Sequence, residues 1–198
     1  MFKVDKKGVV GIDLAAKESN PTGWAFLKGR LLETCLIYMN SEILEKIASC
    51  SPSIVAIDAP LSLPKKGPLR KSDKEMMRRG LHVIPPSFSA MQTLTLRAME
   101  LSKLIADKGH VIIEVHPTST RKVLKMPAKN WKEIQNKLRL MGLTGEINKR
   151  ELSPHEIDAA TAALTAHLYV QGQTENVGNK GEGYIVIPKG DCWRTISL

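Results

Sequence analysis

Cysteines are scarce in this chain, and their positions exclude two common ways of stabilising a small fold. Cys35, Cys50 and Cys192 are odd in number and have neither the spacing of a disulfide framework nor that of zinc ligands. We therefore expect reduced thiols in a reducing compartment. Long hydrophobic runs are also missing, and residues 1–7 lack the apolar stretch of a signal peptide. These absences predict a cytoplasmic protein with no membrane partner.

Length and composition are those of an ordinary globular protein. The chain has 198 residues, of which 42% are hydrophobic and 25% charged. No linker-like segment divides it, so we expect one domain spanning residues 1–198, with a sizeable core. The sequence leaves the oligomeric state open, a dimer included.

Acidic side chains are outnumbered, and the net charge of +9 is concentrated in two blocks. Residues 65–82 and residues 121–150 each contain many more Lys and Arg than Asp and Glu, while the remainder of the chain is slightly negative. Such blocks are typical of proteins that bind nucleic acid, because phosphate contacts dominate that affinity. The alternative is a solvated basic face without a specific partner.

Four acidic residues are the strongest functional signal. Asp13, Asp58 and Glu114 stand at or near the carboxyl ends of short β-branched runs that read as buried parallel strands, and Asp158 lies on a predicted helix. The carboxyl ends of parallel strands share one edge of the sheet, so these carboxylates should converge. Their mutual repulsion calls for a cation, and oxygen ligands favour Mg²⁺ or Mn²⁺. For any one of these acids alone, a helix cap or turn is the simpler explanation.

The order of predicted elements is strand, strand, strand, helix, strand, helix, strand, helices. Three strands lie between residues 8 and 38, followed by a helix over 41–50. A strand over 53–58, a helix over 88–107 and a strand over 111–115 come next. Residues 59–87 and 118–150 should form basic insertions, the first a long irregular excursion and the second containing two short helices. Helical crossovers make the first, fourth and fifth strands parallel.

The last clear helix begins at a capping box. Ser153 is the expected N-cap, Pro154 the first helical residue and Glu156 the partner three residues later. Small side chains from Ala159 to Ala166 should let this helix approach the sheet closely. Residues 173–198 are predicted to be a C-terminal tail with one loosely attached strand.

Seven short segments resemble a prokaryotic family of uncharacterised predicted nucleases with the ribonuclease-H-like fold. They are Gly-Ile-Asp13-Leu-Ala, Thr22-Gly-Trp-Ala, Ile57-Asp58-Ala-Pro60, Arg78-Arg-Gly80, Pro85-Pro-Ser-Phe88, Glu114-Val-His-Pro117 and His155-Glu-Ile-Asp158-Ala-Ala. The resemblance implies an α/β fold with a mixed five-stranded sheet, order 3-2-1-4-5, strand 2 antiparallel, flanked by helices. Holliday-junction resolvases share this fold. The resemblance assigns metal ligation to Asp13 and Asp158, and leaves Asp58 and Glu114 competing for the central-strand position.

Other residues are weaker candidates. His155 shares a helical face with Asp158 and is a candidate catalytic group, although a lone histidine near a helix start is usually a surface residue. His116, two residues after Glu114, and Lys17, in the loop after Asp13, are candidate substrate contacts. The basic blocks add four more candidate phosphate contacts, namely Arg78, Arg79, Lys125 and Lys129.

The leading hypothesis is therefore a Mg²⁺- or Mn²⁺-dependent nuclease. Two ions held by Asp13, Asp58, Glu114 and Asp158 would activate water and stabilise the leaving oxygen. Backbone contacts read charge rather than bases, so we expect recognition of structure rather than sequence. One alternative is an actin-like ATPase or kinase, which the absence of a glycine-rich turn after Asp13 disfavours. The other is a non-catalytic nucleic-acid-binding protein of the same fold.

Overall fold

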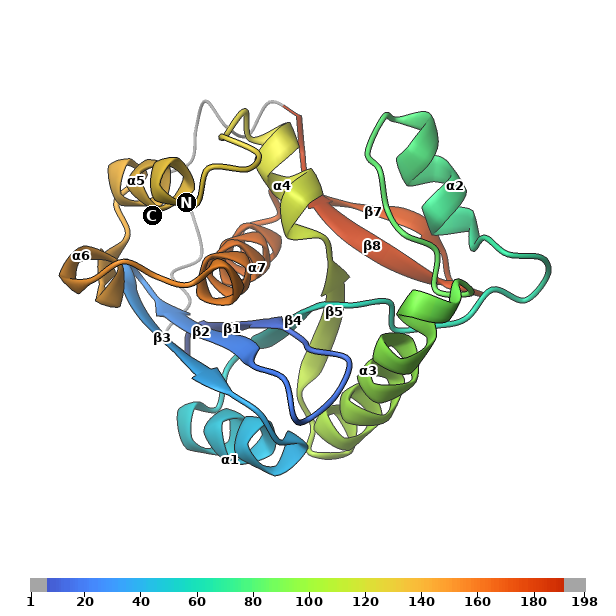
Figure 1. Ribbon diagram of the computed structural model, residues 1–198, viewed down its shortest axis with the longest axis horizontal. Helices are drawn as coiled ribbons and strands as arrows, with labels where there is room; N and C mark the ends of the chain where they lie inside the picture. The colour runs from blue at the N-terminus through green and yellow to red at the C-terminus, as the bar shows by residue number, and fades with distance from the viewer. Residues whose placement is uncertain (1–6, 191–198) are drawn as a thin grey trace.

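A single mixed sheet organises the protein (Figure 1). The computed structural model describes residues 7–190, and within them eight strands run in the order β6-β3-β2-β1-β4-β5-β8-β7. Their bounds are β1 Val9–Asp13, β2 Thr22–Lys28, β3 Leu31–Ile37, β4 Ile54–Asp58, β5 Val111–Val115, β6 Thr144–Gly145, β7 Thr174–Asn179 and β8 Gly183–Pro188.

The five central strands have the predicted ribonuclease-H-like order. β3, β2, β1, β4 and β5 are adjacent in that sequence, with β2 antiparallel to both of its neighbours and β1, β4 and β5 parallel to one another. The fold class and the strand order expected from the sequence are confirmed. Parallel pairing places the carboxyl ends of β1, β4 and β5 at one edge of the sheet.

Helices cover both faces of the sheet (Figure 1). One face packs against α1 and α3, and the other against α7, with α4, α5 and α6 beside it. The bounds are α1 Asn40–Cys50, α2 Lys71–Arg78, α3 Ser89–Asp107, α4 Pro117–Val123, α5 Trp131–Leu140, α6 Glu146–Lys149 and α7 Pro154–Val170. No helix within residues 7–190 has the length and hydropathy required to cross a bilayer.

The predicted close approach of α7 to the sheet is confirmed, and two glycines make it possible. A Cβ on Gly11 of β1 would lie 2.2 Å from the backbone of Ala159 and Ala163, and one on Gly23 of β2 would lie 2.0 Å from the carbonyl oxygen of His155. Both distances are far below van der Waals contact. Any larger residue at these positions would push α7, and the acidic residue that it carries, away from β1.

The C-terminal segment differs from its prediction. Residues 174–188 are not a loose tail, because β8 pairs in parallel with β5 and β7 pairs antiparallel with β8. A separate apolar cluster holds them against α2, with Val177, Ile185 and Ile187 packed on Met76. The predicted irregular excursion over 59–87 therefore contains a helix, α2, that covers this extension of the sheet. Cys192 and the rest of the predicted tail lie outside the described residues.

Candidate functional site

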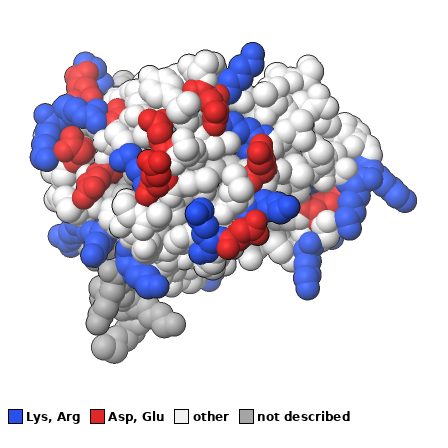
Figure 2. Space-filling view, turned by 90° about the horizontal axis from the view of Figure 1, so that it is seen from below, with Lys and Arg blue, Asp and Glu red and all other residues white. Residues whose placement is uncertain are grey.

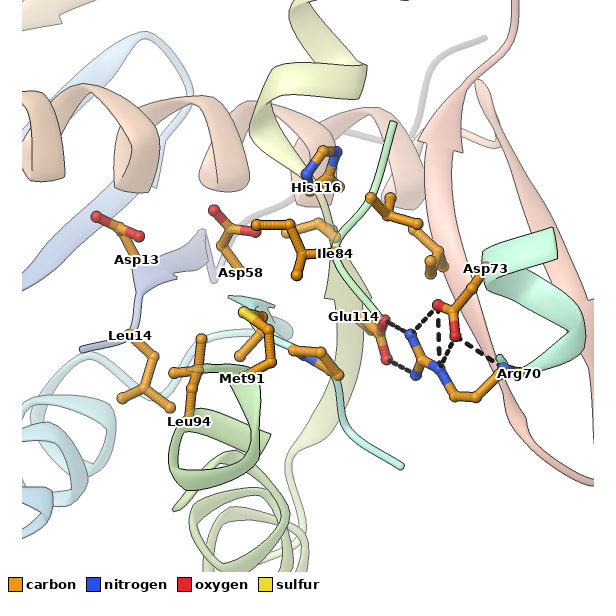
Figure 3. A pocket seen from close by; sticks show the side chains of 15 residues that line it. Asp13, Leu14, Asp58, Arg70, Asp73, Ile84, Met91, Leu94, Glu114 and His116 are labelled. Atoms are coloured by element: carbon orange, nitrogen blue, oxygen red, sulfur yellow. Dashed lines mark hydrogen bonds and ion pairs between the residues drawn. The ribbon is translucent and has the colours of Figure 1, made fainter. Parts of the chain in front are cut away.

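Asp13 and Asp58 form the centre of the candidate site. They are the last residues of β1 and β4 and are directly aligned in the parallel register. Side chains alternate along a strand, so aligned residues share a face. Gly11, two residues before Asp13, contacts α7, so both carboxylates lie on the face that α7 covers. In Figure 3 the two carboxylates point to the same side, as the alternation requires.

Helix α7 contributes two further groups to this edge. Its N-terminus has the predicted capping box, in which Ser153 and Glu156 satisfy each other's backbone N–H groups. This cap fixes the first turn, so that His155 Nδ1 lies 2.6 Å from Asp13 Oδ2. Asp158, one turn later, pairs with the guanidinium of Arg121. Four of the predicted site residues, Asp13, Asp58, His155 and Asp158, are therefore brought together.

The surroundings of Asp58 disfavour its ionised form. Burial raises its pKa well above the usual value, and the neighbouring charges of Asp13 and Asp158 raise it further. Burial also raises the pKa of Asp158, against the opposing charge of Arg121. Within residues 7–190, Asp58 receives neither a hydrogen bond nor an ion pair. It is thus the acid with the greatest need for an added cation.

Glu114 does not join this cluster. It aligns with Ile57 rather than with Asp58, and because side chains alternate along a strand it lies on the opposite face of the sheet. There it accepts hydrogen bonds from Arg70 at 2.6 and 2.8 Å and from the backbone N–H of Leu61 at 2.8 Å. Arg70 also binds Asp73, and all three side chains are buried. Between the two central-strand candidates, this geometry favours Asp58.

A cavity of about 210 Å³ opens beside the acids. Asp13, Asp58, Glu114 and Asp73 provide its acidic wall, and Figure 3 shows the apolar wall formed by Leu14, Ile84, Met91 and Leu94. Arg70 and His116 are the basic residues that line it. Arg70 is already engaged by Glu114 and Asp73, so an anionic substrate entering this cavity would meet uncompensated negative charge.

His116 and Lys17 lie in different surroundings. His116 is the N-cap of α4: its Nδ1 accepts from the backbone N–H of Ser119 at 3.3 Å and lies 2.7 Å from the Ser119 hydroxyl. Burial lowers the pKa of His116 to about 4, and the charge of Arg121 adds to this effect. The ring is therefore neutral at physiological pH. Lys17 is exposed in the loop after β1 and forms no ion pair with the described acids.

The two basic blocks meet on the surface. Lys122 of α4 donates a hydrogen bond to the carbonyl oxygen of Gly80, which follows α2. Arg79 is engaged by Glu75 and Glu175, each at 2.8 Å. It is exposed, as are Arg78, Lys125 and Lys129. On the face shown in Figure 2, basic and acidic side chains are interspersed among the described residues, without a continuous basic field.

Sequence reasoning misses two arginines that determine the charge of the site. Arg121 belongs by position to a basic block expected at the surface, yet it is buried and pairs with Asp158. Arg70 belongs to the other block and is also buried, between Glu114 and Asp73. The available signal is the spacing of three residues between Arg70 and Asp73, where an acid follows an N-cap at the position of a capping-box partner.

The carboxylate oxygens at this edge of the sheet are suitable ligands for a divalent ion, but the side chains do not form a complete ligand set. Within residues 7–190, no three His, Cys, Asp or Glu side chains are grouped closely enough to share an ion. His155 engages Asp13 and Arg121 engages Asp158, which keeps the carboxylates in separate contacts. Mg²⁺ needs only one or two carboxylates when water and phosphate oxygens complete its shell. Asp13 and Asp58 satisfy that requirement.

The family model described as "Protein of unknown function (DUF429)" matches residues 11–182. The chain belongs to this family. The match includes Asp13, Asp58, Glu114 and Asp158, and extends into the turn between β7 and β8. No curated protein shows significant sequence similarity to the chain.

Two solved structures of Thermus thermophilus RuvC resemble the fold. The first, RuvC in complex with a Holliday junction substrate, is 15% identical with a TM-score of 0.47, and the match covers 83% of this chain and 96% of RuvC. The second, RuvC without a stated substrate, is 16% identical with the same TM-score and coverage. Similarity at this level carries no inference about activity.

Proposed function

We propose that the chain is a divalent-metal-dependent phosphodiesterase that acts on nucleic acid. The observation that carries the proposal is the position of Asp58, aligned with Asp13, close to Asp158 and without a cation of its own among the described residues. A buried, repelled carboxylate is costly to the fold, and such strain is typical of functional sites. A metal ion would relieve it.

Asp13 and Asp58 are the residues that would hold the ion. When bound there, Mg²⁺ or Mn²⁺ would polarise a phosphoryl oxygen and lower the pKa of bound water. The lining of the cavity supports a bound metal ion. Its two basic residues cannot neutralise a phosphate, because Arg70 is already paired with carboxylates and His116 is neutral. Positive charge at the reacting phosphate would have to come from a cation that the cavity admits.

His155 would position Asp13 and exchange a proton near it. Its Nδ1 contacts Asp13 Oδ2, and this hydrogen bond is the main reason that the pKa of His155 is raised. The side chain is 48% exposed, so we expect its second ring nitrogen to be accessible to solvent or substrate. An imidazolium at that position is suited to donating a proton to a departing alkoxide.

The substrate class rests on charge. The chain carries a net charge of +9, and a hydrogen bond from Lys122 to the carbonyl oxygen of Gly80 brings its two basic blocks into contact. A polyanion is the partner that this distribution favours. The contacts available from exposed Lys and Arg read phosphate positions, so selection among nucleic acids should depend on structure more than on sequence.

The direct experiment is a cleavage screen over duplex, hybrid, branched and single-stranded DNA and RNA, with Mg²⁺, Mn²⁺ or EDTA. We expect cleavage of at least one substrate with metal and none with EDTA. Asp13→Asn is the loss-of-function control, and Asp107→Asn, at the exposed end of α3, is the matched neutral control. Binding without cleavage of any substrate would instead support a non-catalytic nucleic-acid-binding protein.

A further inference from the structure

Arg121 is the one guanidinium that contacts the acidic cluster of Asp13, Asp58 and Asp158 from within the described fold. It lies on α4, with its side chain 2% exposed, and its Nη1 donates to Asp158 Oδ1. Its Nη2 donates to Thr118 Oγ1 at 3.3 Å, one turn earlier on the same helix. The guanidinium also lies over the ring of Trp131, 5.5 Å from the centroid.

These contacts make Arg121 a fixed charge rather than a mobile one. A guanidinium is ionised at all physiological pH values, and stacking on an aromatic ring restricts its orientation. The Nε atom is buried without a hydrogen-bond partner in the described structure, so the Asp158 contact is the principal compensation for burying this charge. Releasing Asp158 would leave a buried cation uncompensated, which is strongly unfavourable.

The three clustered carboxylates therefore fall into two groups. Asp13 and Asp58 both line the cavity, whereas Asp158 does not. Asp13 contacts an exposed histidine, Asp58 has no cationic contact in residues 7–190, and Asp158 is neutralised by a buried arginine. Two of the three acids are open to an added ion from the cavity, and the third already has its counter-ion.

We propose that the site takes a single divalent ion at Asp13 and Asp58, and that Arg121 supplies the second positive charge permanently at Asp158. Arg121 is thus a positioning residue: it holds Asp158 and balances its charge without touching substrate. The inference rests on the proposed metal site and replaces the two-ion arrangement that the four acids alone suggest. The ion would be one that binds two carboxylates and several water molecules, as Mg²⁺ and Mn²⁺ do.

The number of bound ions tests this inference apart from activity. Mn²⁺ binding to the full-length chain can be measured by electron paramagnetic resonance of the free ion and by calorimetry. We expect one binding site. Asp158→Asn should keep one site with an affinity within a few-fold of wild type, and Asp58→Asn should abolish it. Arg121→Gln should expose Asp158 and create a second, weaker site, which the double variant with Asp158→Asn should remove.

The outcomes separate the inference from the proposed function. Two ions in the wild-type chain, or loss of the single ion in Asp158→Asn, would overturn the one-ion arrangement and leave a metal-dependent enzyme in place. No ion in the wild-type chain would overturn the proposed metal site itself. Should Arg121→Gln or Asp158→Asn fail to fold, the ion count of the wild-type chain still decides the question. Arg121→Lys, which keeps the positive charge, should still give one site, and a second site in it would contradict neutralisation of Asp158 by charge.

Discussion

Asp13 and Asp58 are aligned neighbours at the carboxyl ends of two parallel strands, and the buried guanidinium of Arg121 forms its ion pair with Asp158 rather than with either of them. Parallel pairing of β1 with β4 sets the alignment, so the backbones of the two residues stay adjacent as long as the sheet is intact. This relationship explains why the repulsion persists in the folded protein. At the proposed metal site, a bound cation would relieve it.

Asp58→Asn should stabilise the metal-free protein. Because burial and the charges of Asp13 and Asp158 raise the folded-state pKa of Asp58, stability is lost as pH rises through that pKa. Above that pKa the carboxylate is ionised and the amide removes the penalty, so we expect Asp58→Asn to melt at a higher temperature than the wild-type chain. Thermal melts in EDTA measure it. Asp107→Asn should leave the melting temperature unchanged, and a lower melting temperature for Asp58→Asn would contradict the account.

Glu114→Gln should have the opposite effect. It removes the bidentate partner of buried Arg70 and leaves that guanidinium with Asp73 alone. Breaking a buried ion pair by removing one partner costs roughly 3–5 kcal/mol. Urea denaturation measures the change in the free energy of unfolding. Glu146→Gln, which removes only solvent-exposed ion pairs with Lys149 and Arg150, is the matched control and should barely move the midpoint. A Glu114→Gln variant as stable as this control would rule out the structural role.

His116 should make the protein sensitive to mild acid. Its folded-state pKa of about 4 lies below the usual 6.5. Between these two pH values His116 is protonated in the unfolded chain and neutral in the folded chain. Stability is therefore full above pH 6.5 and falls as pH drops from 6.5 toward 4, by at most about 3 kcal/mol. His116→Asn retains an N-cap side chain and removes the titration. Urea midpoints at pH 7.5 and 5.0 should differ less in the variant; equal differences would exclude His116 as the cause.

The exposed basic residues should set the salt dependence of nucleic-acid binding. Replacing Arg78 and Lys129 together by Gln should weaken binding to all sequences alike and reduce the slope of log affinity against log salt, by about 0.9 for each phosphate of duplex DNA that is no longer neutralised. Arg79→Gln is the control, because Glu75 and Glu175 already engage that guanidinium. Filter binding or fluorescence anisotropy at several salt concentrations measures the slope. A slope unchanged by the double substitution would remove these residues from the interface.

The central sheet and the start of α7 can be predicted from the sequence for identifiable reasons. Short β-branched runs that end in Asp13 and Asp58 specify parallel strands, and the Ser153 capping box specifies where α7 begins. These signals are local. The capping box also fixes the phase of α7, which is why the expectation that Asp158 lies near Asp13 agrees with the geometry.

The remaining features depend on contacts between distant residues. Glu114 stands one residue before the end of its strand, and that offset turns its side chain to the opposite face, where Arg70 binds it from 44 positions away. A composition-based reading places both Arg70 and Arg121 among phosphate-binding side chains, since nothing local marks them as buried. The pairing of β8 with β5 likewise depends on α2 covering the outer strands, a tertiary contact that local patterning does not show.

Metal binding at Asp13 and Asp58 is the claim on which the proposed activity depends, and a thermal melt with and without Mn²⁺ tests it most directly. At a hundredfold excess over its dissociation constant, the ion should add about 2.7 kcal/mol to the wild-type chain by mass action. Asp58→Asn should show no such gain, although it starts from a higher metal-free melting temperature. A wild-type melting temperature unmoved by millimolar Mn²⁺ and Mg²⁺, or an equal shift in Asp58→Asn, would contradict the account.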